Sequence, residues 1–226
     1  MKHFSGKVMN KYIGLLLACC LIAGCTQHDK GVEEEDITED FRCTCPPTIY
    51  LQPYNDFSQQ EAKALIPHLN QFLNDCSLPG IDIEVLPNIQ LTDSLLNDKR
   101  TRYRADKMLK SLPEEQLNAV ILLTHQDISV TYKGRADWGV QGLAFQGKHV
   151  CVVSVFRVKN KKRDYWKVVC HELSHALFNL PHCPNDGPHC IIKDAKGHPD
   201  FSNKTRLCKK CAGKIKILVG SIYSHI

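Results

Sequence analysis

The 226-residue sequence lacks an apolar run long enough to span a bilayer, since its longest, residues 12–23, falls short of the roughly 20 residues that a membrane helix needs. It also lacks a strong charge imbalance, because 29 basic and 24 acidic residues leave a formal net charge of +5. No internal repeat is apparent. These absences argue against a membrane-spanning protein, a nucleic-acid binder and a repeat architecture.

The N-terminus has the pattern of an export signal. Lys2, Lys7 and Lys11 precede the apolar run 12–23, whose end leads into Leu21-Ile22-Ala23-Gly24-Cys25. This ending resembles a bacterial lipobox, so we expect residues 1–24 to be removed and Cys25 to carry lipid. Cys19 marks a weaker competing cleavage site, and a plain secretory signal or an uncleaved anchor is the other alternative. Loss of the three lysines would lower the net charge from +5 to +2.

Residues 25–46 are polar and acidic and have no helical or strand periodicity, as the run Glu33-Glu34-Glu35-Asp36 illustrates. Such a segment is typical of a solvated tether. We therefore expect a protein of the bacterial cell envelope, anchored to a membrane by lipid and facing the periplasm or the exterior. The remaining residues 47–226 are enough for one domain with a sizeable core, which we expect to be monomeric.

Alternation and helical spacing predict a layered α/β domain in this remainder. Strands are expected at 48–53 and 81–86, at the buried run 119–123, and in a hairpin of 142–145 with 150–155. Helices are expected after Ser58, at 101–112 and at 163–179. The fold class is thus α/β (α+β), with a mixed twisted sheet, helices that back it, and a small C-terminal subdomain.

The helix at 163–179 contains His171-Glu172-Leu173-Ser174-His175, an HExxH motif. Residues four apart on a helix leave the same face, with Cβ atoms roughly 5–6 Å apart, so both imidazoles can reach one Zn²⁺. Glu172 is the candidate general base beside that metal. His182 follows in Leu180-Pro181-His182-Cys183 and is a candidate third ligand, with Asp186 and His189 as rivals.

Four of the twelve cysteines have metal-site spacing: Cys183, Cys190, and the CxxC pair Cys208 and Cys211. Four thiolates in two groups fit a closed tetrahedral zinc site. Disulfides are the alternative, because an exported protein meets an oxidising compartment. Cys151 and Cys170 lie in apolar patterns and are expected in the core. A disulfide from Cys43 or Cys45 to Cys76 stays open.

Between Ile49 and Cys211 the sequence resembles the archaemetzincins, zinc metallopeptidases of the metzincin type. The resemblance rests on the opening strand Ile49-Tyr50-Leu51-Gln52-Pro53, on Asp137-Trp138-Gly139-Val140-Gln141-Gly142-Leu143-Ala144 with Val152-Val153-Ser154-Val155-Phe156-Arg157, and on the histidine and cysteine motifs. It implies a metzincin-like domain with two zinc ions. One is a catalytic zinc held by His171, His175 and His182 with Glu172 as base. The other is a structural zinc held by Cys183, Cys190, Cys208 and Cys211.

The sequence departs from the family in four features, and the first two lie in the family's motif HExxHxxGxxHC. The segment from His175 to His182 is one residue longer, and Asn179 takes the place of the glycine. Asparagine tolerates the left-handed conformation that ends a helix, and a π-bulge would absorb the extra residue. Ile192 stands where the family has the methionine beneath the zinc, and the interval from Cys183 to Cys190 is longer.

These features predict hydrolysis of a peptide bond by a metal-activated water, with a peptide or protein as substrate. We expect the substrate to add as a strand along Gly142, Leu143, Ala144 and Phe145, the expected sheet edge above the zinc. The departures favour a second hypothesis, a zinc-stapled lipoprotein that binds a peptide or surface partner without efficient cleavage. A nucleic-acid-binding zinc ribbon is opposed by the export signal and the small charge.

Overall fold

The computed structural model describes residues 48–113, 118–184, 189–196 and 200–223. The expected signal peptide and tether, including Cys25, Cys43 and Cys45, lie outside the described residues. In the described part of the chain, no helix combines the length and apolar character needed to cross a membrane.

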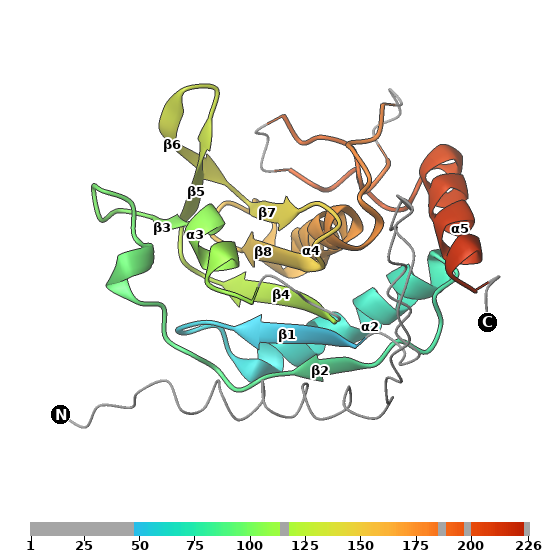
Figure 1. Cartoon of the computed structure of the whole chain (residues 1–226), viewed down its shortest axis with the longest axis horizontal. Helices are drawn as coiled ribbons and strands as arrows, with labels where there is room; N and C mark the ends of the chain where they lie inside the picture. Colours follow the sequence, from blue (N-terminus) through green and yellow to red (C-terminus); the bar gives the residue numbers. More distant parts are fainter. Residues whose placement is uncertain (1–47, 114–117, 185–188, 197–199, 224–226) are drawn as a thin grey trace, which may run out of the picture. The chain divides into compact units, whose positions relative to one another are not determined.

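A five-stranded mixed sheet forms the centre of the domain, in the order β2-β1-β4-β8-β7 (Figure 1). Its strands are β1 (Ile49–Pro53), β2 (Ile83–Val85), β4 (Ala119–Thr124), β7 (Gly142–Phe145) and β8 (Val150–Ser154). The first three and β8 run parallel, whereas β7 pairs antiparallel with β8 and forms an edge. The predicted hairpin, the buried run and the mixed sheet are confirmed. The predicted strand 81–86 is shorter than expected.

Both faces of the sheet are covered, which is why β4 is buried at every position and is apolar from Ala119 through Leu123. Alternate side chains point to opposite faces. Ile121 and Leu123 pack on one side in the larger core cluster, and Val120 and Leu122 pack on the other in the smaller one.

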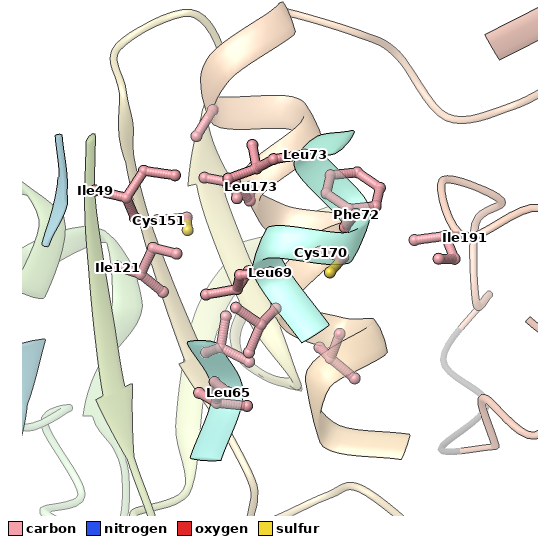
Figure 2. Close-up of a cluster of buried hydrophobic side chains, with 14 of the residues drawn as sticks. Ile49, Leu65, Leu69, Phe72, Leu73, Ile121, Cys151, Cys170, Leu173 and Ile191 are labelled. Atoms are coloured by element: carbon pink, nitrogen blue, oxygen red, sulfur yellow. The ribbon is translucent and has the colours of Figure 1, made fainter. Parts of the chain in front are cut away.

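The larger cluster lies between the sheet and the helices α2 (Gln59–Asp75) and α4 (Lys161–Phe178) (Figure 2). Ser58 caps α2 as predicted, because its hydroxyl accepts the Glu61 N–H while the Glu61 carboxylate accepts the Ser58 N–H. Leu173 and Cys170 of α4 face Leu69 and Leu73 of α2 within this core. Cys76, Cys151 and Cys170 are all buried.

A second sheet, in the order β3-β5-β6, was not predicted from the sequence. It comprises β3 (Tyr103–Arg104), β5 (Ile128–Tyr132) and β6 (Arg135–Val140). Lys133 and Gly134 have positive φ angles of 47° and 76° and form the tight turn of the β5–β6 hairpin. Only Gln141 separates β6 from the edge strand β7 of the main sheet.

The helix predicted at 101–112 is wrong at its start. The observed α3 spans Ala105–Lys110, and Tyr103, which lies inside the predicted helical range, pairs instead with Ile128 of β5. Tertiary strand pairing therefore overrides local helical spacing here. The chain also forms α5 (Lys209–Tyr223), which begins inside the CxxC pair and was not predicted.

Candidate metal centres

The helix α4 presents His171 and His175 from the same face, one turn apart, into the interior. Their ring centroids are 4.8 Å apart, and their Nε2 atoms lie 3.2 Å from each other. Two ligands on one tetrahedral zinc, at about 2.0–2.1 Å each, place their nitrogens roughly this far apart. The two rings are therefore arranged as the HExxH motif predicts.

A backbone carbonyl fixes the tautomer of each of these histidines. The Nδ1–H of His171 donates to the Ile191 carbonyl at 2.7 Å, and that of His175 donates to the Leu180 carbonyl at 2.5 Å. Because Nδ1 carries the proton, the lone pair is on Nε2, which is the atom that points into the cluster. Burial lowers the pKa of His175 and lowers that of His171 well below its usual value. Both rings are therefore prepared as neutral ligands.

Asn179 ends α4 in the left-handed conformation, with φ 48° and ψ 31°, as predicted. The expected π-bulge is wrong, because the helix is α-helical from Lys161 through Phe178. The extra residue instead extends the helix, and the chain reverses one position later than in the family pattern. This reversal brings the His182 ring to centroid distances of 4.8 Å from His175 and 5.2 Å from His171.

One ligand atom from each of His171, His175 and His182 lies within 4.8 Å of the others. His189, a rival third ligand, bonds the Asn203 carbonyl and does not join this cluster. Asp186 lies outside the described residues. The donor set of three neutral imidazoles fits a zinc ion and leaves one tetrahedral position for a water or a substrate.

Glu172 follows His171 on α4 and is buried, with 9% of its surface exposed. Burial raises the pKa of its carboxyl group to about 8, and the positive charge of Lys204 opposes that rise. Its side chain lies directly against the backbone of β7: a Cβ added at Gly142 would be 2.5 Å from Cγ and 2.7 Å from Oε1 of Glu172. The glycine on the edge strand thus makes room for the candidate base.

Lys204 is a residue at this centre that sequence analysis missed. It is 6% exposed, its ammonium group donates to the Lys193 carbonyl, and it lies 4.1 Å from the centroid of the Phe201 ring. Burial lowers the pKa of Lys204 to about 8, although Asp194 and Glu172 favour its charged form. A lone lysine in a polar C-terminal segment gives no sequence signal for such burial.

Cys183, Cys190, Cys208 and Cys211 form a second cluster, with sulfur atoms within 4.8 Å of one another. The Cys183 and Cys208 sulfurs are 3.6 Å apart, far beyond the ~2.05 Å of a disulfide. None of the four forms a disulfide, so the disulfide alternative does not describe this arrangement. Four converging sulfurs, three of them on buried residues, fit a closed structural zinc site.

The two clusters share short stretches of chain. His182 and Cys183 are consecutive, and Ile191, whose carbonyl holds His171, directly follows Cys190. Ile192, which replaces the family's methionine, is fully buried and accepts the Cys183 N–H at 3.1 Å. A buried apolar residue therefore stands at the sequence position of the family's methionine.

The edge strand β7 has backbone groups available for a partner. The Gln141 carbonyl accepts the Ser154 N–H at 2.8 Å, and the antiparallel register continues from there through Leu143 opposite Val152. Because bonded and non-bonded pairs alternate, the N–H and C=O groups of Gly142 and Ala144 face away from β8.

No protein-family model matches this sequence, and no curated protein matches it. Several solved structures, however, are similar to this protein. The archaemetzincin from Archaeoglobus fulgidus, determined with malonate, is 25% identical with a TM-score of 0.60, and the match covers 74% of this chain and 99% of that one. The archaemetzincin from Methanopyrus kandleri is 19% identical with a TM-score of 0.60, covering 78% and 98%.

A zinc-dependent peptidase from Methanocorpusculum labreanum is also similar, with 20% identity, a TM-score of 0.53, and coverage of 74% of this chain and 99% of that one. The predicted resemblance is confirmed: the domain has an archaemetzincin-like fold, and the match extends over almost the whole length of each of these proteins.

Proposed function

We propose that this protein is a zinc-dependent peptidase. The observation that carries the proposal is the convergence of three neutral imidazoles next to a buried glutamate, against a sheet edge with free backbone groups. The archaemetzincin-like fold supports the same conclusion, because the similar structures include a zinc-dependent peptidase.

His171, His175 and His182 would hold the catalytic zinc. A zinc ion bound there would polarise a substrate carbonyl and lower the pKa of a water molecule toward ~7. Glu172 accepts the proton of the attacking water and later transfers it to the departing amine. The Glu172 side chain is buried and lies against Gly142, which limits its movement. The carboxyl group therefore stays where it can act on both the water and the amine. The carbonyls of Ile191 and Leu180 hold the two helix-borne rings in their ligand tautomers.

The substrate would bind as an added strand along Gly142, Leu143, Ala144 and Phe145. The outward N–H and C=O groups of Gly142 and Ala144 supply the hydrogen bonds of such an addition. These bonds are made to the peptide backbone, so they favour an extended segment of polypeptide whatever its side chains are. The same strand adjoins Glu172, so a peptide added along it would run beside the candidate base.

A second zinc would occupy the four cysteines and hold the C-terminal subdomain. Its role is structural, since four protein ligands leave no position for a substrate. Because Cys183 follows His182, this site also fixes the segment that delivers the third histidine.

Incubation of the zinc-loaded domain with a peptide library, with and without a chelator, tests the proposed activity. We expect cleavage products that disappear with the chelator and return when zinc is restored. Retention of peptides without cleavage would instead favour the hypothesis of a catalytically weak binding lipoprotein, for which the longer His175–His182 segment and Ile192 argue.

We also propose that lipid on Cys25 anchors the protein to a membrane of the cell envelope. The lipobox-like residues 21–25 and the acidic segment after them support this location. The variant Cys25→Ala should lose incorporation of labelled fatty acid and should leave the membrane fraction. Unchanged labelling of this variant would refute the assignment.

A further inference from the structure

We propose that a network of four charged residues, Arg102, Asp127, Asp137 and Arg157, positions the edge strand β7 for substrate binding. The proposal rests on the proposed peptidase function. Asp137 and Arg157 belong to sequence motifs that the catalytic centre does not use. The network joins the main sheet to the sheet β3-β5-β6 at the point where β6 leads into β7. The residues of the metal centres do not make this connection.

The pair Arg157 and Asp127 is the centre of this network. Arg157 follows β8, and Asp127 follows β4. Their contact is bidentate, with Nε to Oδ1 and Nη2 to Oδ2 both at 2.7 Å. The Asp127 side chain is only 13% exposed, so its charge needs such a partner. Two planar groups bonded at two points fix each other's orientation as well as their separation.

Arg102 extends the network to β6. Its Nε donates to Oδ2 of Asp127 at 2.7 Å, and its Nη1 donates to Oδ2 of Asp137 at 2.9 Å and to the Asp137 carbonyl at 3.3 Å. The signs of the charges alternate along the chain of contacts, so every ion in it has an opposite neighbour. The β6 backbone is thereby tied to the segments that follow β4 and β8.

Gly139 of β6 lies against the Arg157 guanidinium. An added Cβ at Gly139 would be 2.3 Å from Cζ and 2.4 Å from Nη2 of Arg157, so only glycine permits this approach. Two residues later, the Gln141 side-chain amide donates to the Arg157 carbonyl at 3.4 Å, and the Gln141 carbonyl accepts the Ser154 N–H. Arg157 thus holds the corner from Gly139 to Gln141 by its side chain and its backbone.

This corner determines where β7 begins. Gly142 is the next residue, and its backbone lies against Glu172 with no space for a methyl group. A shift of β7 by about 1 Å would change both the gap to Glu172 and the position of the outward groups of Gly142 and Ala144. Misplacement of that size costs as much as about 10²-fold in rate. The four residues are therefore positioning residues, which act on the substrate through β7.

Arg157→Lys tests this inference, because lysine keeps the charge and loses the bidentate geometry. We expect kcat/KM for a cleaved peptide to fall about 10- to 100-fold, mainly through a higher KM, with the zinc content unchanged. The Leu143 amide, which is bonded to β8, should exchange its hydrogen faster. Arg163→Lys is the matched control, since Arg163 makes a similar two-point contact with Asp164 at the start of α4, away from β7.

Gly139→Ala is a second variant that keeps all four charges, and we expect it to act like Arg157→Lys. In an Arg157→Ala background Gly139→Ala should add little, because the guanidinium that its methyl group would strike is gone. Wild-type KM and wild-type Leu143 exchange in folded Arg157→Lys and Gly139→Ala would overturn the proposal. If the wild type cleaves no peptide, the peptidase function fails. Hydrogen exchange then decides alone: faster exchange at Leu143 supports the positioning role, and unchanged exchange refutes it.

Discussion

Replacement of Gly142 by alanine isolates the contact between the edge strand and the candidate base. The new Cβ would be 2.5 Å from Cγ, 2.7 Å from Oε1 and 2.8 Å from Cδ of Glu172. Ordinary contacts between carbon atoms are about 3.5–4.0 Å, so one partner must move by about 1 Å. The atoms that it strikes belong to the outer part of a side chain, so we expect Glu172 to move and the sheet to persist.

This displacement has two measurable costs. Overpacking of a buried site by one methyl group destabilises a fold by about 1–3 kcal/mol. Misplacement of a catalytic group by about 1 Å lowers the rate by up to about 10²-fold. We therefore expect Gly142→Ala to fold, to bind two zinc ions, and to lose most of its kcat.

The assay is peptide hydrolysis at matched zinc content, with thermal unfolding measured on the same samples. Gly213→Ala in α5 is the control, because nothing lies within 4 Å of a Cβ added there. A Gly142→Ala variant with wild-type kcat would show that Glu172 does not depend on β7 for its position, and the reasoning from this contact would be refuted.

Three further substitutions test separate parts of the centres. Cys208→Ser should reduce zinc from two ions to one per chain and lower the melting temperature far more than a surface change, because structural zinc contributes folding free energy directly. Two ions in that variant would contradict the Cys₄ assignment. His182→Ala should empty the histidine site and leave the cysteine site loaded, whereas unchanged zinc affinity at the histidine site would mean that another group is the third ligand. In metal-free, reduced protein, Glu172→Gln should alter the pH dependence of unfolding. Burial raises the pKa of Glu172 from 4.5 to about 8, so the folded state holds the proton more tightly and this contribution to stability is lost as pH rises through that range. Between pH 4.5 and about 8, the free energy of unfolding of the variant should rise relative to that of the wild type by about 1.4 kcal/mol for each pH unit. If urea unfolding gives the two proteins the same pH dependence, the pKa shift is refuted.

Local signals in the sequence predicted much of the framework. Ser58 and Glu61 specify the start of α2 by contacts within four residues, and Asn179 specifies the end of α4 by its tolerance of positive φ. The apolar run of β4 required a strand buried on both faces. The three histidines were also predictable, because two share one helical turn and the third follows the helix end closely.

The features that were missed depend on partners far away in the sequence. Tyr103 has helical spacing but pairs with Ile128. The hairpin of β5 and β6 is an exception, because Ile128-Ser129-Val130-Thr131-Tyr132 alternates apolar and polar residues before the Lys133-Gly134 turn, so the sequence does contain a strand signal there. The space that Gly142 leaves for Glu172 is invisible until β7 and α4 pack together. Burial of Lys204 arises from the same long-range packing of the C-terminal segment.

The central claim is that Glu172 is the base of a zinc-dependent peptidase. The most direct measurement compares wild type and Glu172→Gln, both loaded with two zinc ions, on a peptide that the wild type cleaves. The amide is nearly isosteric but cannot accept the proton of the water. We predict unchanged zinc content and a rate lower by about 10²–10⁴. Equal rates for the two proteins, or no cleavage of any peptide by the wild type, would contradict the account.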